Sequence, residues 1–266
     1  MEYIVQRAVA VIREKYGEPL TLDELAQMVL VSKFHFLRSF RRTTGVTPGR
    51  FLSAVRLAEA KRLLLDTSLK VSDISAQVGY SSIGSFTRRF TESVGLPPTQ
   101  YRQSATAVPL PHPQRPASTG RNSVSGYVRP WRTGRTEVFV GLFDSPILQG
   151  RPAVCAVLEA PGPFRLTGVP AGTWFLHAAT LPEPGAAGCR TRQWRQPVQL
   201  VDCTGALTMR DQDAVTAERH ERVILSPRPA EWFRPPVLLA LPHQMPGVTT
   251  PRKLLTGYRE PSATAV

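Results

Sequence analysis

Long apolar runs and paired cysteines are missing from this sequence. Its three cysteines, Cys155, Cys189 and Cys203, are an odd number without Cys-x-x-Cys spacing, which argues against a disulfide framework or a zinc ribbon. No segment approaches the roughly 18 consecutive apolar residues that a membrane span needs, and the N-terminus is charged and amphipathic. We therefore expect a cytoplasmic protein that is neither exported nor inserted into a membrane.

Acidic residues are also fewer than basic residues. The chain has 20 Asp and Glu against 33 Lys and Arg, a formal net charge of +13, which attracts polyanions such as nucleic acid or acidic lipid. The charge does not choose between those two, and because lysine is rare here, codon bias can account for part of the arginine excess. With 42% apolar and 20% charged residues, the composition is that of a folded globular protein.

Proline is scarce in the first part of the chain. Of 25 prolines only four precede residue 104, and proline is poorly tolerated inside helices, so residues 1–103 are expected to form an all-α domain. Residues 104–135, rich in Pro, Ser and Gly, are predicted to be a linker. Residues 136–246 contain short alternating or β-branched runs and are predicted to form an all-β, sandwich-like domain, followed by a tail over 247–266. The expected strands are residues 137–143, 153–158, 173–178, 197–201, 222–225 and 237–241.

The helical region contains one internal repeat, between residues 20–51 and 69–101. The offset between matching residues is 49 at first, and after one inserted residue it becomes 50. A single duplication of this size indicates a duplicated supersecondary unit rather than a solenoid. The matching pairs are Leu20 and Leu69, Leu25 and Ile74, Val29 and Val78, Ser32 and Ser81, Phe36 and Phe86, Arg38 and Arg88, Phe40 and Phe90, Gly45 and Gly95, Pro48 and Pro98, and Phe51 and Tyr101.

Each copy predicts two short helices separated by a tight turn. The first helix begins at a Thr or Ser followed three residues later by Glu or Ser, which in the first copy is the spacing of a capping box. The second helix follows a serine that can cap it, buries two phenylalanines and ends at a glycine suited to the left-handed conformation. These residues are Thr21, Glu24, Ser32, Phe36, Phe40 and Gly45 in the first copy, and Ser72, Ser75, Ser81, Phe86, Phe90 and Gly95 in the second.

A longer helix is predicted between the two copies. It begins at Pro48 and runs for about 18 residues, with Phe51, Val55, Ala58 and Leu65 on its apolar stripe. At about 1.5 Å per residue it is roughly 27 Å long. The second helices of the two units would then lie nearly one turn of DNA apart, since successive major grooves recur at about 34 Å.

Two stretches resemble the DNA-binding domain of the AraC/XylS family of bacterial transcription regulators, over residues 3–103. They read LTLDELAQMVLVSKFHFLRSFRRTTGVTPGRFLSAVRLAEAKRLL and VSDISAQVGYSSIGSFTRRFTESVGLPPTQYR. The second stretch is the more specific, from ISAQVGY through SFTRRF to GLPPTQYR. The resemblance implies that the second helix of each unit, residues 33–42 and 82–91, enters the major groove of double-stranded DNA.

The resemblance also implies roles for individual side chains. Arg38 and Arg88 are the best candidates for bidentate contacts to guanine. The implied base-contact residues are Phe34, Leu37, Arg38, Ile83, Gly84, Ser85 and Arg88. The implied phosphate contacts, which fix the register of the protein on the duplex without reading sequence, are Lys33, His35, Arg41, Arg42, Thr87 and Arg89.

The two units are unequal. Leu30 stands where the second unit has Gly79, which costs about 1 kcal/mol or more if the turn needs a positive φ. Leu37 and Ile83 offer only apolar contacts, such as to a thymine methyl group. Together with Gly84, these residues predict that the second unit reads sequence sparingly.

A second resemblance lies in the C-terminal half. GPFRLTGVPAGTWFLHA, residues 162–178, resembles carboxypeptidase-regulatory-like or transthyretin-like β-sandwich domains, which implies an edge hairpin with Pro170 and Gly172 in its turn. We interpret the aromatic residues Trp174, Phe175, Trp194 and Trp232 as core rather than as a ligand pocket. The scattered Cys155, His177, Cys189, Cys203, His220 and His243 lack the paired spacing of a metal site.

No nucleophile elbow, phosphate-binding loop, dinucleotide fingerprint or His-Glu-x-x-His motif is found, so we predict no cofactor and no enzymatic activity. We expect a transcription regulator, an activator or a repressor, whose partners are double-stranded DNA, RNA polymerase, a small-molecule effector in the C-terminal domain and a second copy of the chain. Because the DNA reader precedes the presumed sensor, the reverse of the commoner family order, the properties of family sensor domains do not transfer. Two alternatives stay open for the C-terminal domain, an enzyme or a scaffold that only dimerises.

Overall fold

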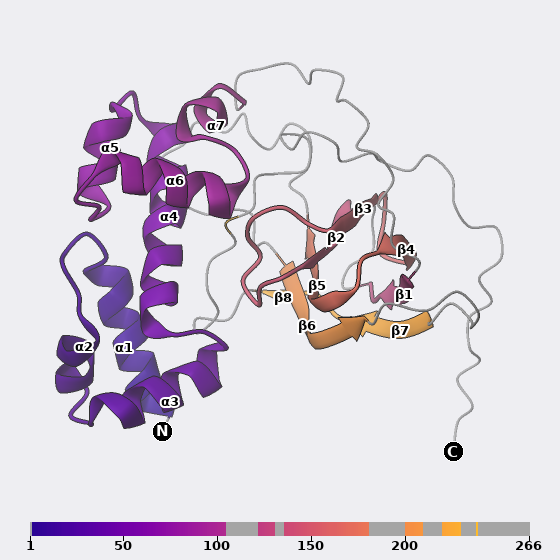
Figure 1. Cartoon of the computed structure of the whole chain (residues 1–266), viewed down its shortest axis with the longest axis horizontal. Helices are drawn as coiled ribbons and strands as arrows, with labels where there is room; N and C mark the ends of the chain where they lie inside the picture. The colour runs from indigo at the N-terminus through magenta and orange to yellow at the C-terminus, as the bar shows by residue number, and fades with distance from the viewer. Residues whose placement is uncertain are drawn as a thin grey trace.

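The computed structural model describes residues 2–104, 122–130, 136–180, 200–209, 220–229 and 238. A helical part comes first in the chain and a strand-rich part follows and lies beside it (Figure 1). In the part of the chain that the structure describes, no helix is both long enough and apolar enough to cross a membrane.

The helical part repeats one two-helix unit on either side of a long helix. The first unit is α2 and α3, the second is α5 and α6, and α4 connects them, as the internal repeat predicts. The bounds are α1 Glu2–Glu14, α2 Leu22–Met28, α3 Lys33–Thr44, α4 Pro48–Asp66, α5 Val71–Gln77, α6 Ile83–Val94 and α7 Pro98–Ser104.

The helix starts are confirmed in the first unit and differ in the second. Thr21 makes the expected capping box, since its hydroxyl accepts from the Glu24 amide at 3.2 Å and the Glu24 carboxylate accepts from the Thr21 amide at 2.7 Å. In the second unit the prediction that a helix begins at Ser72 is wrong, because Lys70 is the N-cap of α5 and no side chain caps it. Ser82 rather than Ser81 caps α6, because the inserted residue of the repeat falls in the turn before the cap.

The helical core is built on aromatic residues from both copies. The four repeated phenylalanines are fully buried, as expected, and Phe36 packs edge-on against Phe40 with ring centroids 5.5 Å apart. On α4, Phe51 and Val55 are buried as predicted, but Leu65 is 45% exposed. A single stripe fails because α4 packs against α1 and α3 near its start and against α5 and α7 near its end, so its buried face turns along its length.

The strand-rich part contains two sheets. In the described residues, one sheet has the order β4-β1-β7, with β1 and β7 parallel, and the other has the order β3-β2-β5-β6-β8 with antiparallel pairs. The bounds are β1 Asn122–Val128, β2 Val138–Phe143, β3 Val154–Leu158, β4 Pro163–Val169, β5 Gly172–Thr180, β6 Leu200–Met209, β7 His220–Leu225 and β8 Arg228–Pro229. Strands expected at 137–143, 153–158, 173–178 and 222–225 are confirmed, whereas the segment 197–201 overlaps only the start of β6 and most of 237–241 lies outside the described residues.

Two expectations for the strands are wrong. Residues 122–128, placed in the linker by their polar composition, form β1, the middle strand of the three-stranded sheet, where Asn122 and Ser123 are buried. The strands on either side of Pro170 are not an edge hairpin, because β4 pairs with β1 and β5 pairs with β2 and β6. Gly172, with φ of 142°, lets the chain pass from one sheet to the other at this point.

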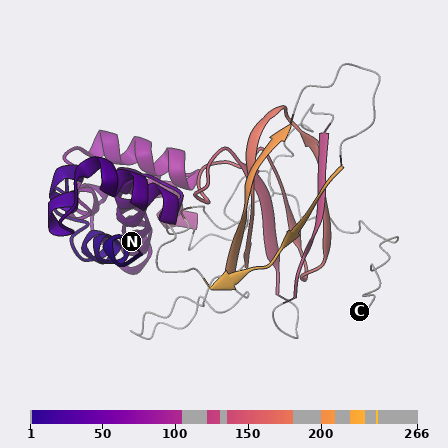
Figure 2. The same ribbon diagram turned by 90° about the horizontal axis from the view of Figure 1, so that it is seen from below.

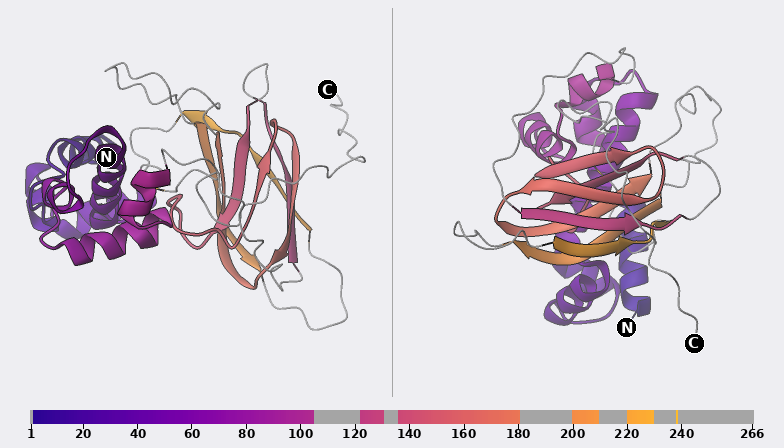
Figure 3. Two further views of the ribbon diagram at one scale, coloured as in Figure 1. Left: turned by 90° about the horizontal axis from the view of Figure 1, so that it is seen from above. Right: turned by 90° about the vertical axis from the view of Figure 1, so that its right-hand side faces the viewer.

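Strand β2 is buried on both faces, and this joins the two halves of the protein. Val138, Val140 and Leu142 point into a core shared by the two sheets. Phe139 and Phe143 belong instead to the cluster that contains the helical core. Figures 2 and 3 show the helices on one side of the strands, so that a face of the five-stranded sheet is directed at the helical part.

Candidate nucleic-acid interface

The two helices expected to enter DNA, α3 and α6, begin and end in the same way. The Ser32 hydroxyl accepts from the His35 amide at 3.4 Å, and the Ser82 hydroxyl accepts from the Ser85 amide at 3.2 Å. Both helices end at a glycine in the left-handed region, Gly45 with φ of 79° and Gly95 with φ of 92°. The caps and the buried phenylalanines therefore present equivalent outward faces on the two helices.

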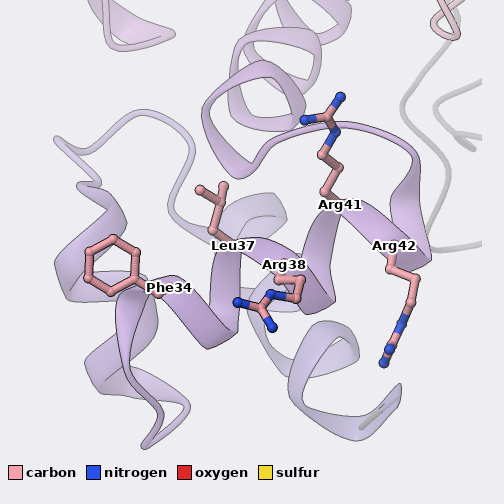
Figure 4. Close-up of a pocket in the computed structure, with 5 residues that line it drawn as sticks. All are labelled: Phe34, Leu37, Arg38, Arg41 and Arg42. Atoms are coloured by element: carbon pink, nitrogen blue, oxygen red, sulfur yellow. The ribbon is translucent and has the colours of Figure 1, made fainter.

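The outward face of α3 combines apolar and cationic side chains. Phe34 is 71% exposed, Leu37 is half-buried, and Arg38, Arg41 and Arg42 are exposed. These five side chains line an open depression of about 570 Å³. Figure 4 shows Phe34, Leu37 and Arg41 projecting along one ridge of the helix, with Arg38 and Arg42 projecting beside it. The structure thus brings together, on one helix face, five of the residues implied to contact DNA.

The outward face of α6 carries fewer cationic and large apolar side chains than that of α3. Ile83 is 50% exposed, and a Cβ atom added to Gly84 would meet no atom within 4 Å, so the first turn is a low, open surface. The Ser85 hydroxyl already donates to the Ser82 carbonyl at 2.9 Å. Arg88 is exposed on the next turn.

The remaining implied phosphate contacts lie at the edges of these faces. Lys33 is exposed and forms an ion pair with Asp23 at 3.4 Å, and Arg89 lies 3.8 Å from Glu92. His35 is exposed and Thr87 is half-buried. Arg38, Arg41 and Arg42 form no ion pair with any residue that the structure describes, so α3 presents three cations without a carboxylate beside them.

The turn before each outward-facing helix needs a left-handed residue. Leu30 has φ of 56° and is 89% exposed, while Gly79 at the matching place has φ of 84°. The predicted departure is therefore a strained residue in the first unit. A Cβ atom on Gly79 would lie 2.8 Å from the Gly17 carbonyl oxygen and 2.9 Å from Arg56 Nη2, so the second unit also lacks room for a side chain.

Arg56 connects the two units and was not anticipated from the sequence. From α4 its Nε donates to the Tyr16 carbonyl at 2.7 Å and its Nη2 donates to the Glu18 carbonyl at 2.8 Å, both in the loop before α2. Its guanidinium also lies over the ring of Tyr80 in the turn before α6, and burial lowers its pKa. In the sequence Arg56 is one of three arginines of α4, and nothing near it reveals these partners.

A segment between β2 and β3 holds the strands against α4 and against the second unit. The guanidinium of Arg50, in the first turn of α4, donates to the Ser145 hydroxyl at 3.2 Å. The Gly150 amide donates to the carbonyl of Ser93 near the end of α6. Between these points Ile147 and Leu148 are buried in the cluster that contains the helical core. The outward arginines of α3 and Arg88 of α6 are exposed with this segment docked.

Comparison with known proteins supports the reading of the helical part. Residues 25–104 match the family described as helix-turn-helix domain. The lactose operon transcription activator of Staphylococcus xylosus is 33% identical over 98 residues, which are 37% of this chain and 35% of that protein. The transcriptional activator AarP of Providencia stuartii is 37% identical over 87 residues, which are 33% of this chain and 64% of that protein.

A solved transcriptional regulator of Chromobacterium violaceum, described as having an AraC-type DNA-binding domain, is 27% identical and covers 39% of this chain and 92% of its own, with a TM-score of 0.38. The present chain spans about a third of the length of the lactose operon activator, and the family match covers residues 25–104. Residues 25–104 accordingly match a helix-turn-helix domain, and the relatives similar to this part of the chain are transcription activators.

Proposed function

We propose that the chain is a sequence-specific transcription regulator, and that its helical domain, residues 1–103, inserts α3 and α6 into adjacent major grooves of one face of a DNA duplex. The observation that carries the proposal is the exposed face of α3, on which three arginines that form no ion pair with any described residue lie beside an apolar pair. Such a face is suited to a DNA duplex, whose phosphate backbone is anionic and whose major groove presents both polar and apolar groups.

Base reading is assigned to outward residues in the first half of each of the two helices. The Arg38 guanidinium presents two parallel N–H donors, which match the O6 and N7 acceptors of guanine. Phe34 and Leu37 form an apolar surface suited to a thymine methyl group. On α6, Ile83, Gly84, Ser85 and Arg88 fill the corresponding roles, and Arg88 is the one side chain of that set able to make a bidentate contact.

Phosphate contacts are assigned to the flanking side chains. Arg41 and Arg42 extend from the second half of α3, where the strands of the duplex would lie on either side of the groove. Lys33 would exchange its exposed pairing with Asp23 for a phosphate oxygen, which is a small change because exposed ion pairs contribute little. His35, Thr87 and Arg89 complete the set.

The two units are proposed to contribute unequally. The α3 face carries three arginines without ion-pair partners among the described residues, whereas α6 offers Arg88 and an Arg89 that already faces Glu92. Gly84 leaves a gap in the ridge of α6 where a side chain would otherwise touch base edges. The first unit therefore supplies most of the affinity and most of the base preference.

The strand-rich region is proposed to sense an effector or to mediate association, with RNA polymerase as a further partner of the bound regulator. Its support is the segment from Ser145 to Gly150, which contacts both α4 and α6, so that a change in the strands can reach the connecting helix and the second unit. Two other proposals, an enzymatic domain and a pure dimerisation scaffold, predict respectively turnover of a bound molecule and binding that depends only on protein concentration.

Selection of genomic fragments by the full chain, followed by footprinting, tests the proposal. The expected result is an asymmetric site of two short elements on one face of the duplex, about one helical turn apart, with the stronger protection over one element. A footprint confined to a single groove, or binding without sequence preference, would contradict it.

A further inference from the structure

A thiol and an imidazole meet on the sheet face that is directed at the helices. Cys203 on β6 lies opposite His177 on β5, with Sγ 3.6 Å from Nε2. His177 is only 4% exposed, so its imidazole is enclosed, while Cys203 as a residue is half-buried rather than fully enclosed. The β5–β6 pairing is bulged between Phe175 and His177, and bulges commonly re-aim side chains at functional sites.

The hydrogen bonds of His177 fix its proton beside the sulfur. Its Nε2 lies 2.9 Å from the carbonyl oxygen of Ser145, and because a carbonyl only accepts, Nε2 must carry the hydrogen. The Cys203 thiol has its own acceptor, the Thr204 carbonyl at 3.2 Å. When the thiol proton leaves, the N–H of His177 is the donor next to the sulfur, and a neighbouring donor favours the thiolate, which is the reactive form.

The same imidazole holds the segment that docks onto the helices. The carbonyl group of Ser145 accepts from His177, and its hydroxyl accepts from the Arg50 guanidinium at 3.2 Å and from the Ile147 amide at 3.1 Å. Four residues therefore form a continuous chain of contacts from the sulfur of Cys203 to the first turn of α4. An event at the sulfur has a direct structural route to the helix that separates the two units.

We propose that Cys203 is an oxidation site for small hydroperoxides and that its state is passed through His177 and Ser145 to Arg50. The sulfur attacks one peroxide oxygen and the O–O bond breaks. The leaving group, hydroxide from hydrogen peroxide or an alkoxide from an organic hydroperoxide, takes up the proton that the thiol gives up and becomes water or an alcohol, and the sulfur, oxidised by two electrons, becomes a sulfenic acid. The new oxygen lies within reach of the His177 N–H and competes with the Ser145 carbonyl for it, which loosens the docked segment.

Cys155 provides a matched control within the chain. Cys155 on β3 pairs with Gly141 on β2, and Gly141 pairs with His177 on β5. Like Cys203, Cys155 is half-buried. One strand separates it from the imidazole. A thiol that reacts only because it is accessible would show equal reaction at the two positions.

The first experiment treats the full chain carrying Cys189→Ser with hydrogen peroxide in the presence of a dimedone probe and locates the adduct by peptide mass. The expected result is at least about tenfold faster labelling of Cys203 than of Cys155, in keeping with the dependence of thiol reactivity on its surroundings. Equal labelling of the two, or no adduct at Cys203, would overturn the assignment of the site.

The second experiment measures the consequence in the same oxidised protein. Hydrogen exchange of the Ser145–Gly150 peptide should rise on oxidation, and affinity for the selected DNA should fall at least about fivefold. Neither change should occur in Cys203→Ser, and Arg50→Gln should form the adduct but lose the effect on DNA. An adduct that leaves both exchange and affinity unchanged would refute the relay. Failure of the untreated chain to bind DNA would instead refute the proposed function. The hydrogen-exchange measurement would still test the effect of Cys203 oxidation on the Ser145–Gly150 segment.

Discussion

The Arg56 guanidinium lies over the ring of Tyr80, with Cζ 5.9 Å from the ring centroid, while it donates to two carbonyl groups in the loop before the first unit. One side chain of α4 thereby connects the turn of the second unit to the loop that precedes the first. The distance between α3 and α6 is set by the length of α4, and their relative rotation is held by contacts of this kind.

Replacing Arg56 by Ala is expected to lower the free energy of unfolding by about 1 to 3 kcal/mol, because it leaves two carbonyl acceptors without their donor and removes the contact with Tyr80. Urea unfolding followed by circular dichroism measures the change. Arg42→Ala, which removes an exposed arginine without these contacts, should leave the midpoint within about 0.5 kcal/mol of wild type. Equal effects of the two substitutions would show that Arg56 is not a structural tie.

The two left-handed turns give opposite expectations. Leu30→Gly should raise the free energy of unfolding by about 0.5 to 1 kcal/mol, because glycine adopts a φ of 56° without the strain of a side chain. Gly79→Ala should lower it by at least about 1 kcal/mol, since the new Cβ would meet a backbone oxygen and the Arg56 side chain. Thermal melts of both variants beside wild type provide the comparison, and a stabilised Gly79→Ala protein would contradict the turn geometry.

Stability should depend on pH through Lys61 and Tyr101, whose Nζ and ring centroid lie 5.6 Å apart. Burial lowers the pKa of Lys61 to about 8 and raises the pKa of Tyr101 above its ordinary value. Between about pH 8 and about pH 10 this lysine is largely protonated in the unfolded chain and largely neutral in the folded protein. The contribution of Lys61 to the free energy of unfolding therefore rises with pH over this range. Above about pH 10 the unfolded chain loses the tyrosine proton first, so the contribution of Tyr101 falls.

Urea midpoints measured from pH 7 to pH 11 test this pair. Lys61→Met should remove the rise between pH 8 and pH 10 and keep the decline above it, while Tyr101→Phe should do the reverse. Profiles of wild type and Lys61→Met that run parallel over the whole range would show that the lysine titrates as it does in the unfolded chain.

The helical part could be predicted well from local sequence patterns. Its apolar residues recur at helical spacing, and its two-helix unit occurs twice. The capping box at Thr21, the left-handed ends at Gly45 and Gly95, and the strain at Leu30 each depend on a few neighbouring residues. The start of α5 was missed because no side chain caps it, so Lys70 carries no local signal.

The strand-rich part was harder to predict because its pairings are non-local. Residues 122–128 have a polar composition and become the middle strand of a sheet only because β4 and β7 flank them. Neither the contact of Arg50 with Ser145 nor that of His177 with Cys203 has a sequence signature, since the first joins residues 95 apart and the second depends on a bulge. The base and phosphate roles stay predictions that rest on resemblance and on the exposed face of α3.

Sequence reading through α3 is tested most directly by measuring the affinity of wild type, Arg38→Ala and Lys33→Ala for the selected site and for its single base-pair variants at several salt concentrations. Arg38→Ala should lose about 1 to 3 kcal/mol of binding free energy and its preference at one base pair, whereas Lys33→Ala should bind every variant more weakly and lower the salt slope by about 1. If both substitutions leave the affinity and the base preference unchanged at fixed salt, α3 does not lie in the major groove.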